Sequence, residues 1–157
     1  MKVAINGENS VALTILFDES GFLKASNMQQ LIGASAKARF LLKTSSVECA
    51  FDCIIDIEEL AVFYKELCRF LVSESNCTIF SSHDNLFLLK FERIDGFVKC
   101  SYECREYSPV KYAISIEFHT DETQVYNCRK ELSSLFTTHS RNANANDFDI
   151  NKFSKWW

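Results

Sequence analysis

The chain has 157 residues, of which 47% are hydrophobic and 24% are charged. This balance is typical of one globular domain and argues against intrinsic disorder. The formal net charge of -4 disfavours nucleic-acid binding, because contacts to phosphates need a basic surface. No apolar run approaches the ~18–20 residues that span a bilayer, and the N-terminus lacks the uninterrupted apolar segment of a signal peptide. We therefore expect a cytoplasmic protein without a nucleic-acid or membrane partner.

The first part of the chain is predicted to form strands. Short apolar runs predict strands at about residues 2–6, 11–17 and 38–43. Apolar and other residues then alternate from Val47 to Cys53, which is the period of a half-buried strand. Because such strands keep one face in water, they favour an antiparallel sheet.

The spacing becomes helical after this strand. Apolar residues recur every three or four positions from Leu60 to Leu71, which predicts an amphipathic helix over about residues 57–72. Asp56 is followed three residues later by Glu59, which is the pattern of a capping box. We therefore expect both side chains to cap this helix.

Three further strands and a second helix are predicted in the rest of the chain. The strands lie at about residues 86–91, 98–104 and 114–118, with a turn at 92–96, and helical spacing predicts an amphipathic helix over about 122–136. The sequence shows no internal repeat. These elements predict an α+β fold with an antiparallel, curved β-sheet, either a sandwich or an open barrel, and two amphipathic helices.

The composition changes late in the chain, at the polar stretch SRNANAND. We therefore expect a single α+β domain over residues 1–139, followed by a polar linker and an aromatic tail over residues 140–157. The tail, FDINKFSKWW, is rich in aromatic residues, which often mark contacts when they cluster. We expect this tail to dock on the protein's own sheet. A contact between two copies of the chain is the second alternative, and a contact with a binding partner is the third. Either a monomer or a weak homodimer is expected.

The seven cysteines are expected to be free thiols. Their number is odd, and a chain of this length can bury a core without disulfides. Two pairs have C-x3-C spacing, Cys49/Cys53 and Cys100/Cys104, and both pairs lie on predicted strands. Residues four apart on a strand are ~13 Å apart, which is too far for one pair to bind one zinc ion. We expect no metal and no cofactor.

The stretch IEFHTDETQVY places four polar side chains where the last strand becomes the second helix. Thr120 or Asp121 can accept a hydrogen bond from a backbone N–H of the first helical turn, and the helix dipole favours the acids Asp121 and Glu122 there. His119 should point to the outer face of its strand. The cluster is therefore predicted to cap a helix rather than to bind a metal.

Sequence motifs of enzymes are absent: there is no Gly-rich phosphate loop, no G-x-S-x-G, no H-E-x-x-H and no C-x2-C. We expect no catalytic residue and a protein that is not an enzyme. Two alternatives stay open. One is a small hydrolase or transferase whose site is assembled from His83, His119 and scattered acids, and the other is a structural adaptor subunit.

Five acids and no Lys or Arg lie between Lys43 and Lys65. As one contiguous acidic surface they would attract a basic partner and accelerate its association. The alternative is a solvated strand face followed by helix caps. These candidate partner-binding residues are Glu48, Asp52, Asp56, Glu58 and Glu59.

Two motifs resemble the WapI-type family of small bacterial immunity proteins. One is the helix DIEELAVFYKEL (residues 56–67), which matches a dL..F...L pattern, and the other is the junction IEFHTDET (116–123), which matches an F-x-T-D-Q-T-like pattern, with Glu122 in place of Gln. The resemblance covers roughly residues 10–137. It implies an immunity protein that binds and neutralises the toxic C-terminal domain of a polymorphic or contact-dependent growth inhibition toxin. Such toxins are often nucleases with basic surfaces. Thr120 and Asp121 carry over as helix caps.

Overall fold

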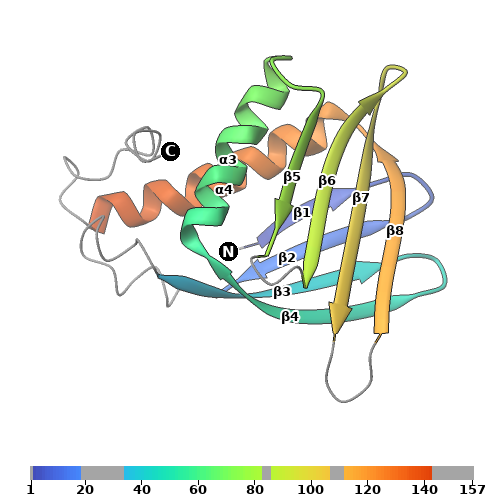
Figure 1. The fold of residues 1–157 in the computed structure, drawn as a ribbon, viewed down its shortest axis with the longest axis horizontal. Coiled ribbons are helices and arrows are strands. Elements are labelled where there is room, and N and C mark those ends of the chain that lie inside the picture. Colours follow the sequence, from blue (N-terminus) through green and yellow to red (C-terminus); the bar gives the residue numbers. More distant parts are fainter. Residues whose placement is uncertain (1, 19–33, 83–85, 107–111, 143–157) are drawn as a thin grey trace.

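The structure, a computed structural model, describes residues 2–18, 34–82, 86–106 and 112–142. These residues form two four-stranded antiparallel sheets and two helices (Figure 1). The predicted α+β class with antiparallel sheets and two helices is confirmed. Strands of the two sheets cross each other in Figure 1, and the sheets do not join into a closed barrel.

Sheet A contains the first four strands in sequence order, joined by antiparallel pairing. Its strands are β1 (Lys2–Asn6), β2 (Ala12–Phe17), β3 (Ser35–Lys43) and β4 (Glu48–Asp56). All four were predicted, although β3 begins earlier and β4 ends later than the sequence indicated. Helix α3 (Ile57–Leu71) follows β4 directly, as predicted.

Sheet B has the same order of strands and is also followed by a helix. Its elements are β5 (Cys77–Ser81), β6 (Phe87–Ile94), β7 (Phe97–Glu106), β8 (Tyr112–Thr120) and helix α4 (Glu122–Asn142). Strand β5 was not predicted. Helix α4 continues past residue 136, so the predicted start of the linker at Ser140 is wrong. Polar residues such as Ser and Arg do not stop a helix, and no Gly or Pro lies there to end it. The rest of the predicted linker and tail of residues 140–157, from residue 143 on, lies outside the described residues.

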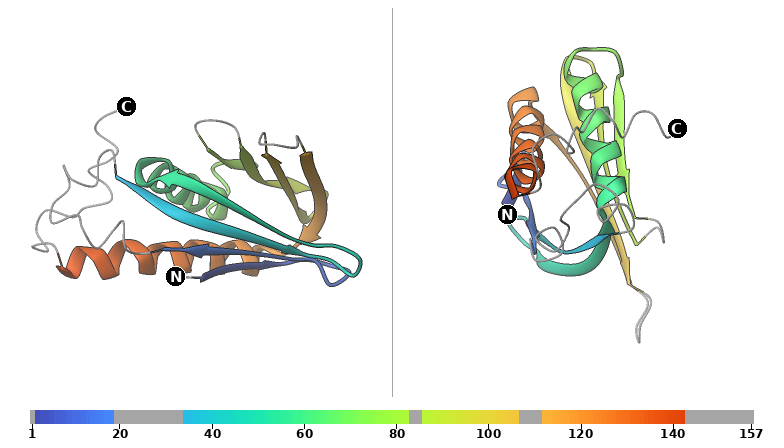
Figure 2. Two further views of the ribbon diagram at one scale, coloured as in Figure 1. Left: turned by 90° about the horizontal axis from the view of Figure 1, so that it is seen from below. Right: turned by 90° about the vertical axis from the view of Figure 1, so that its left-hand side faces the viewer.

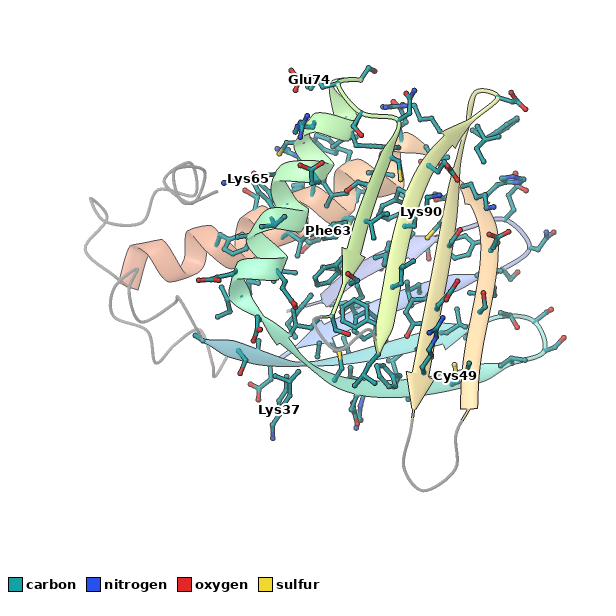
Figure 3. All side chains as sticks on the ribbon, in the orientation of Figure 1. Lys37, Cys49, Phe63, Lys65, Glu74 and Lys90 are labelled. Carbon is teal, nitrogen blue, oxygen red and sulfur yellow. The ribbon has the colours of Figure 1, made fainter. Side chains whose placement is uncertain are left out.

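The two halves repeat one topology, four antiparallel strands and then a helix, although no repeat is visible in the sequence. Each helix packs on the other half. Helix α3 follows sheet A and packs against β5, whereas α4 follows sheet B and packs against β1 (Figure 2). The rings of Phe63 on α3 and Phe80 on β5 stack with their centroids 4.7 Å apart, and Phe63 lies between helix and strand in Figure 3. The first strand of each sheet is therefore next to a helix, and the last strands, β4 and β8, lie at the opposite edges.

Aromatic side chains join the inner faces of the two sheets. The ring of Phe40 on β3 has its centroid 4.7 Å from that of Phe87 on β6 and 5.7 Å from that of Tyr102 on β7. All three side chains are fully buried. Burying a large apolar side chain contributes about 1.5–3 kcal/mol, so these three rings stabilise the packing of one sheet on the other. No helix in the described part of the chain is long and apolar enough to cross a membrane.

Candidate interaction surface

The acids predicted to bind a partner lie on or next to β4. The side chains of Glu48, Asp52 and Asp56 are exposed on the outer face of sheet A, while Cys53 on the opposite face is buried. The alternation read from the sequence is therefore confirmed. The remaining two acids, Glu58 and Glu59, are half-buried in the first turn of α3.

Two of these acids do not belong to a uniformly acidic surface, because β3 places basic side chains beside them. The antiparallel register sets Arg39 opposite Asp52 and Lys43 opposite Glu48. Arg39 donates two hydrogen bonds to the carboxylate of Asp52, at 2.6 and 2.7 Å. Lys43 Nζ lies 4.0 Å from a carboxylate oxygen of Glu48. A stretch without bases in the sequence thus becomes a surface of both signs in the fold.

The ion pair between Arg39 and Asp52 shifts the pKa values of both groups, although both side chains are exposed. Hydrogen bonding from Arg39 holds the pKa of Asp52 below its ordinary value, and the same bond raises the pKa of Arg39. Because both side chains face water, solvent screens most of their attraction. The pair therefore organises the surface more than it stabilises the fold.

Apolar side chains lie among these charges on the outer face of sheet A. The side chain of Ile54 is 63% exposed, and those of Leu16 and Leu41 are half-buried. A groove of about 620 Å³ is lined by Leu16, Arg39, Asp52 and Ile54, among others. It borders Asp18, and residues 19–33 beyond it lie outside the described part of the chain. Lys37 also lines the groove and points away from the body of the protein in Figure 3.

The predicted helix caps are confirmed in one half and not in the other. In α4, the Asp121 carboxylate accepts a hydrogen bond from the backbone N–H of Gln124 at 3.0 Å, as predicted. Thr120 is not a cap: its side chain points inward and its hydroxyl donates to the carbonyl oxygen of Asn6 at 2.6 Å, which ties β8 to β1. The predicted cap by Thr120 is therefore wrong.

At the start of α3, Asp56 occupies the N-cap position but makes no side-chain cap hydrogen bond. The predicted capping box of Asp56 with Glu59 is therefore wrong on the aspartate side. Strand β4 continues to Asp56, and the next backbone N–H, that of Ile57, donates to the carbonyl oxygen of Ala34 at 3.0 Å. The backbone that precedes β3 thus satisfies the first N–H of the helix, which is not one that a capping side chain would reach.

His119 lies on the outer face of β8, as predicted, and is exposed. Its Nδ1 is 3.7 Å from a carboxylate oxygen of Glu8, and its ring centroid is 5.9 Å from that of Phe97. The residues that the structure describes contain no group of three or more His, Cys, Asp or Glu side chains that could hold a metal ion. His83 lies outside the described residues, as does the side chain of His139.

All seven cysteines are free, as predicted. Burial raises the pKa of Cys128 to about 12, and it raises the pKa of Cys100 further. Both side chains are therefore uncharged thiols at neutral pH, and a thiol is a far weaker nucleophile or metal ligand than a thiolate. These two cysteines are core residues.

A second groove, of about 580 Å³, lies between the end of α3 and the start of α4 and was not predicted from the sequence. Its walls include Leu71 at the end of α3, the following residue Val72, and Tyr126 and Arg129 from α4. The Arg129 guanidinium lies over the Tyr126 ring at 5.1 Å, and its Nε is buried without a hydrogen-bond partner among the described residues. Helical spacing explains the contact between Tyr126 and Arg129, but no pattern in the sequence indicates that the two helices meet.

No model of a protein family matches the chain, and no curated protein matches it. Among solved structures, a chain from the crystal structures of Trypanosoma brucei MRP1/MRP2 is similar, with a TM-score of 0.46 and 8% identity over 89% of this chain and 84% of that chain. A similarity at this level identifies neither a family nor a function.

Proposed function

We propose that this protein is an immunity protein, which binds the toxic C-terminal domain of a cognate bacterial toxin in the cytoplasm and neutralises it by occupying a surface. The proposal rests on the two motifs that resemble the WapI-type family. The observation that carries it is the outer face of sheet A, where exposed Ile54 lies beside the ion pair of Arg39 and Asp52. An apolar contact surrounded by charged side chains is typical of the surfaces through which proteins bind each other.

The mixed charge of this face specifies what the partner must provide. Because β3 supplies cations and β4 supplies anions, a partner with a single sign of charge complements only one strand. A basic toxin domain would meet β4, and its acidic or polar side chains would meet β3. A basic partner is attracted less strongly over long distances by this face of mixed charge than it would be by a uniformly acidic face. The rate of association should therefore depend only moderately on salt concentration.

The test begins with the gene beside the one that encodes this chain. If a secreted toxin is encoded directly upstream, its C-terminal domain produced alone should arrest growth, and co-production of this chain should restore it. The two purified proteins should then elute together as a 1:1 complex on size exclusion. Growth arrest that this chain does not relieve, or a metabolic operon in place of a toxin gene, would count against the proposal.

A variant of the surface sharpens this test. Ile54→Lys should weaken the complex and the growth rescue, because it replaces the exposed apolar side chain by a cation that repels a basic partner. Phe97→Lys is the matched control, since Phe97 is exposed to a similar extent, at 59%, but lies at the β6–β7 hairpin of sheet B. Equal loss in both variants would place the contact elsewhere.

A further inference from the structure

The last strand of each sheet is an edge strand in the described part of the chain. Strand β4 pairs with β3 alone, whereas the edge of β8 is partly occupied, because the backbone N–H of Glu8 donates to the carbonyl oxygen of His119 at 3.0 Å. Each of the two strands is nine residues long. By contrast, β1 and β5 at the other edges lie against α4 and α3. A long free edge presents unpaired backbone N–H and C=O groups, which can pair with an added strand from another chain.

The side chains along β4 determine what an added strand must carry. Its outer face presents Glu48, Asp52 and Asp56 at every fourth residue, with Ala50 and Ile54 between them. A strand added at this edge would lie ~4.8 Å from β4 and roughly twice as far from β3. Because Coulomb energy falls with distance, the acids of β4 would outweigh the bases of β3 for such a strand.

The ion pair between Arg39 and Asp52 does not prevent this contact. Arg39 reaches both carboxylate oxygens of Asp52 from the β3 side. Each carboxylate oxygen has two lone pairs, so Asp52 can accept another donor from the opposite side. Asp56 faces Ser35 across the β3–β4 ladder, and that position adds no cation from β3.

A second copy of this chain is a poor occupant of the same edge. Two β4 strands paired antiparallel over their whole length would set Asp52 opposite Asp52 and Glu48 opposite Asp56. Like charges that are directly opposite across a strand pair are destabilising. The acids of β4 therefore act against self-association through this edge.

The edge of β8 offers a different surface. Its acid, Glu117, is bound by Lys99 at 2.8 Å and by the hydroxyl of Ser101 at 3.2 Å. The other exposed positions are Ala113, Ser115 and His119. This edge therefore lacks both the repeated acids and the exposed Ile of β4.

We infer that the partner contributes an extended, basic strand that pairs antiparallel or parallel with the free edge of β4, with Lys or Arg on the face that lies beside Glu48, Asp52 and Asp56. The inference rests on the proposed function for the identity of the partner, but not for the chemistry of the edge. Backbone hydrogen bonds would supply much of the affinity, and the alternating cations would supply the selectivity.

Three synthetic nonapeptides test the edge without knowledge of the toxin. The first, KVKVKVKVK, presents its cations on one face of a strand; the second, KKKKKVVVV, has the same composition but gathers the cations at one end; the third, EVEVEVEVE, reverses the charge. The full chain should bind the first peptide at least tenfold more tightly than the other two in fluorescence anisotropy. Amide shifts in NMR should follow residues 48–56.

Matched lysine variants locate the binding. Ile54→Lys should weaken binding of the first peptide at least tenfold, because it adds a repelling cation to the β4 edge. Ser115→Lys makes the same change of charge on β8 and should alter binding less than twofold. Circular dichroism checks that both variants are folded, and both substitutions replace exposed side chains.

Several outcomes would overturn the inference. These are equal binding of the two lysine peptides, an unchanged affinity of the Ile54→Lys variant, amide shifts away from β4, and concentration-dependent self-association that shifts the β4 amides. If the Ile54→Lys variant still neutralises a toxin domain with full affinity, the edge is not the contact although the proposed function stands. If the peptides bind β4 but no toxin is neutralised, the edge binds basic strands and the proposed function fails.

Discussion

The two halves of the molecule have one topology but different outer surfaces. Their inner faces meet the same requirement, since Phe40 from sheet A and Tyr102 from sheet B are both fully buried and stack on each other. Their outer faces differ in where apolar side chains are exposed: Ile54 of sheet A lies on the edge strand β4 beside an ion pair, whereas sheet B exposes Ile79 on β5 and Phe97 at the β6–β7 hairpin, and Lys99 pairs with Glu117 on its edge strand β8. Packing between the sheets constrains the inner residues of both halves alike. The outer faces are not constrained in this way. We therefore expect a binding surface where the two outer faces differ.

The largest expected effect tests the equivalence of the inner faces. Phe40→Ala and Tyr102→Ala should each lower the free energy of unfolding by about 3–5 kcal/mol, because each leaves a cavity where the two sheets meet. Phe97→Ala, at an exposed position, should lower it by less than about 1 kcal/mol. Urea denaturation followed by circular dichroism measures all three. A similar loss of unfolding free energy in the Phe97→Ala variant would show that the outer face of sheet B is also packed.

The next largest change in the free energy of unfolding is expected for glycines in two hairpins. A Cβ on Gly7, in the β1–β2 hairpin, would collide with the Phe118 ring of β8, so Gly7→Ala should cost about 1–3 kcal/mol. Gly96, in the β6–β7 hairpin, has open space around it but a φ of +86°, so Gly96→Ala should cost only about 1 kcal/mol, from backbone strain. The same denaturation experiment compares the two. The reverse order would mean that Phe118 moves aside without cost.

The helix caps give a smaller difference between the halves. Asp121→Ala removes the cap hydrogen bond to Gln124 and should lower the free energy of unfolding by about 1 kcal/mol. Asp56→Ala should change it by only a few tenths of a kcal/mol, because Asp56 makes no side-chain cap hydrogen bond. Thermal unfolding of the two variants measures the difference. Equal losses would mean that Asp56 caps α3 in solution.

The smallest expected change in stability depends on pH and concerns two acids on the edge strands, Asp52 on β4 and Glu117 on β8. The pKa of Asp52 is lowered by its hydrogen bond from Arg39, and that of Glu117 by its hydrogen bond from Lys99. A folded-state pKa below the unfolded value gives stability that is present above the unfolded pKa and is lost as the pH falls through the folded pKa, here below about pH 4. Carboxyl NMR titrations should show both depressed values. Arg39→Gln should raise only the pKa of Asp52, and Lys99→Gln only that of Glu117.

Periodicity in the sequence predicts most of the fold, because strand and helix patterns are local. Short apolar runs and alternating residues predicted every strand except β5. In β5 polarity does not follow burial, since Thr78 is buried beside Phe80 whereas Ile79 is exposed, and CTIFS therefore shows no alternation. The repeat was missed because a topology restricts which positions are apolar, not which residues fill them. Helix α4 extends beyond its apolar stripe, so its end was placed too early.

The candidate surface was harder to predict, since it depends on which strands are neighbours. The outward direction of Glu48 and Asp52 follows from alternation along one strand. Their neutralisation by Lys43 and Arg39 follows only from the β3–β4 register, which no single segment encodes. The helix caps also show that a local pattern cannot predict contacts with distant segments. Asp121 caps its own helix as the local pattern predicts, whereas Thr120 bonds to a residue on β1, 114 positions away in the sequence.

The exchange of helices between the halves has a consequence for how the chain is made. Among the described elements, strand β1 leaves the ribosome first, and the helix that packs beside it, α4, leaves last. Sheet A therefore cannot complete its native packing before α4 has been made, and the nascent first half exposes part of its hydrophobic surface until then. Because neither half contains its own covering helix, the two should form and melt as one cooperative unit, and two fragments divided between α3 and β5 should each be unstable alone and fold when mixed.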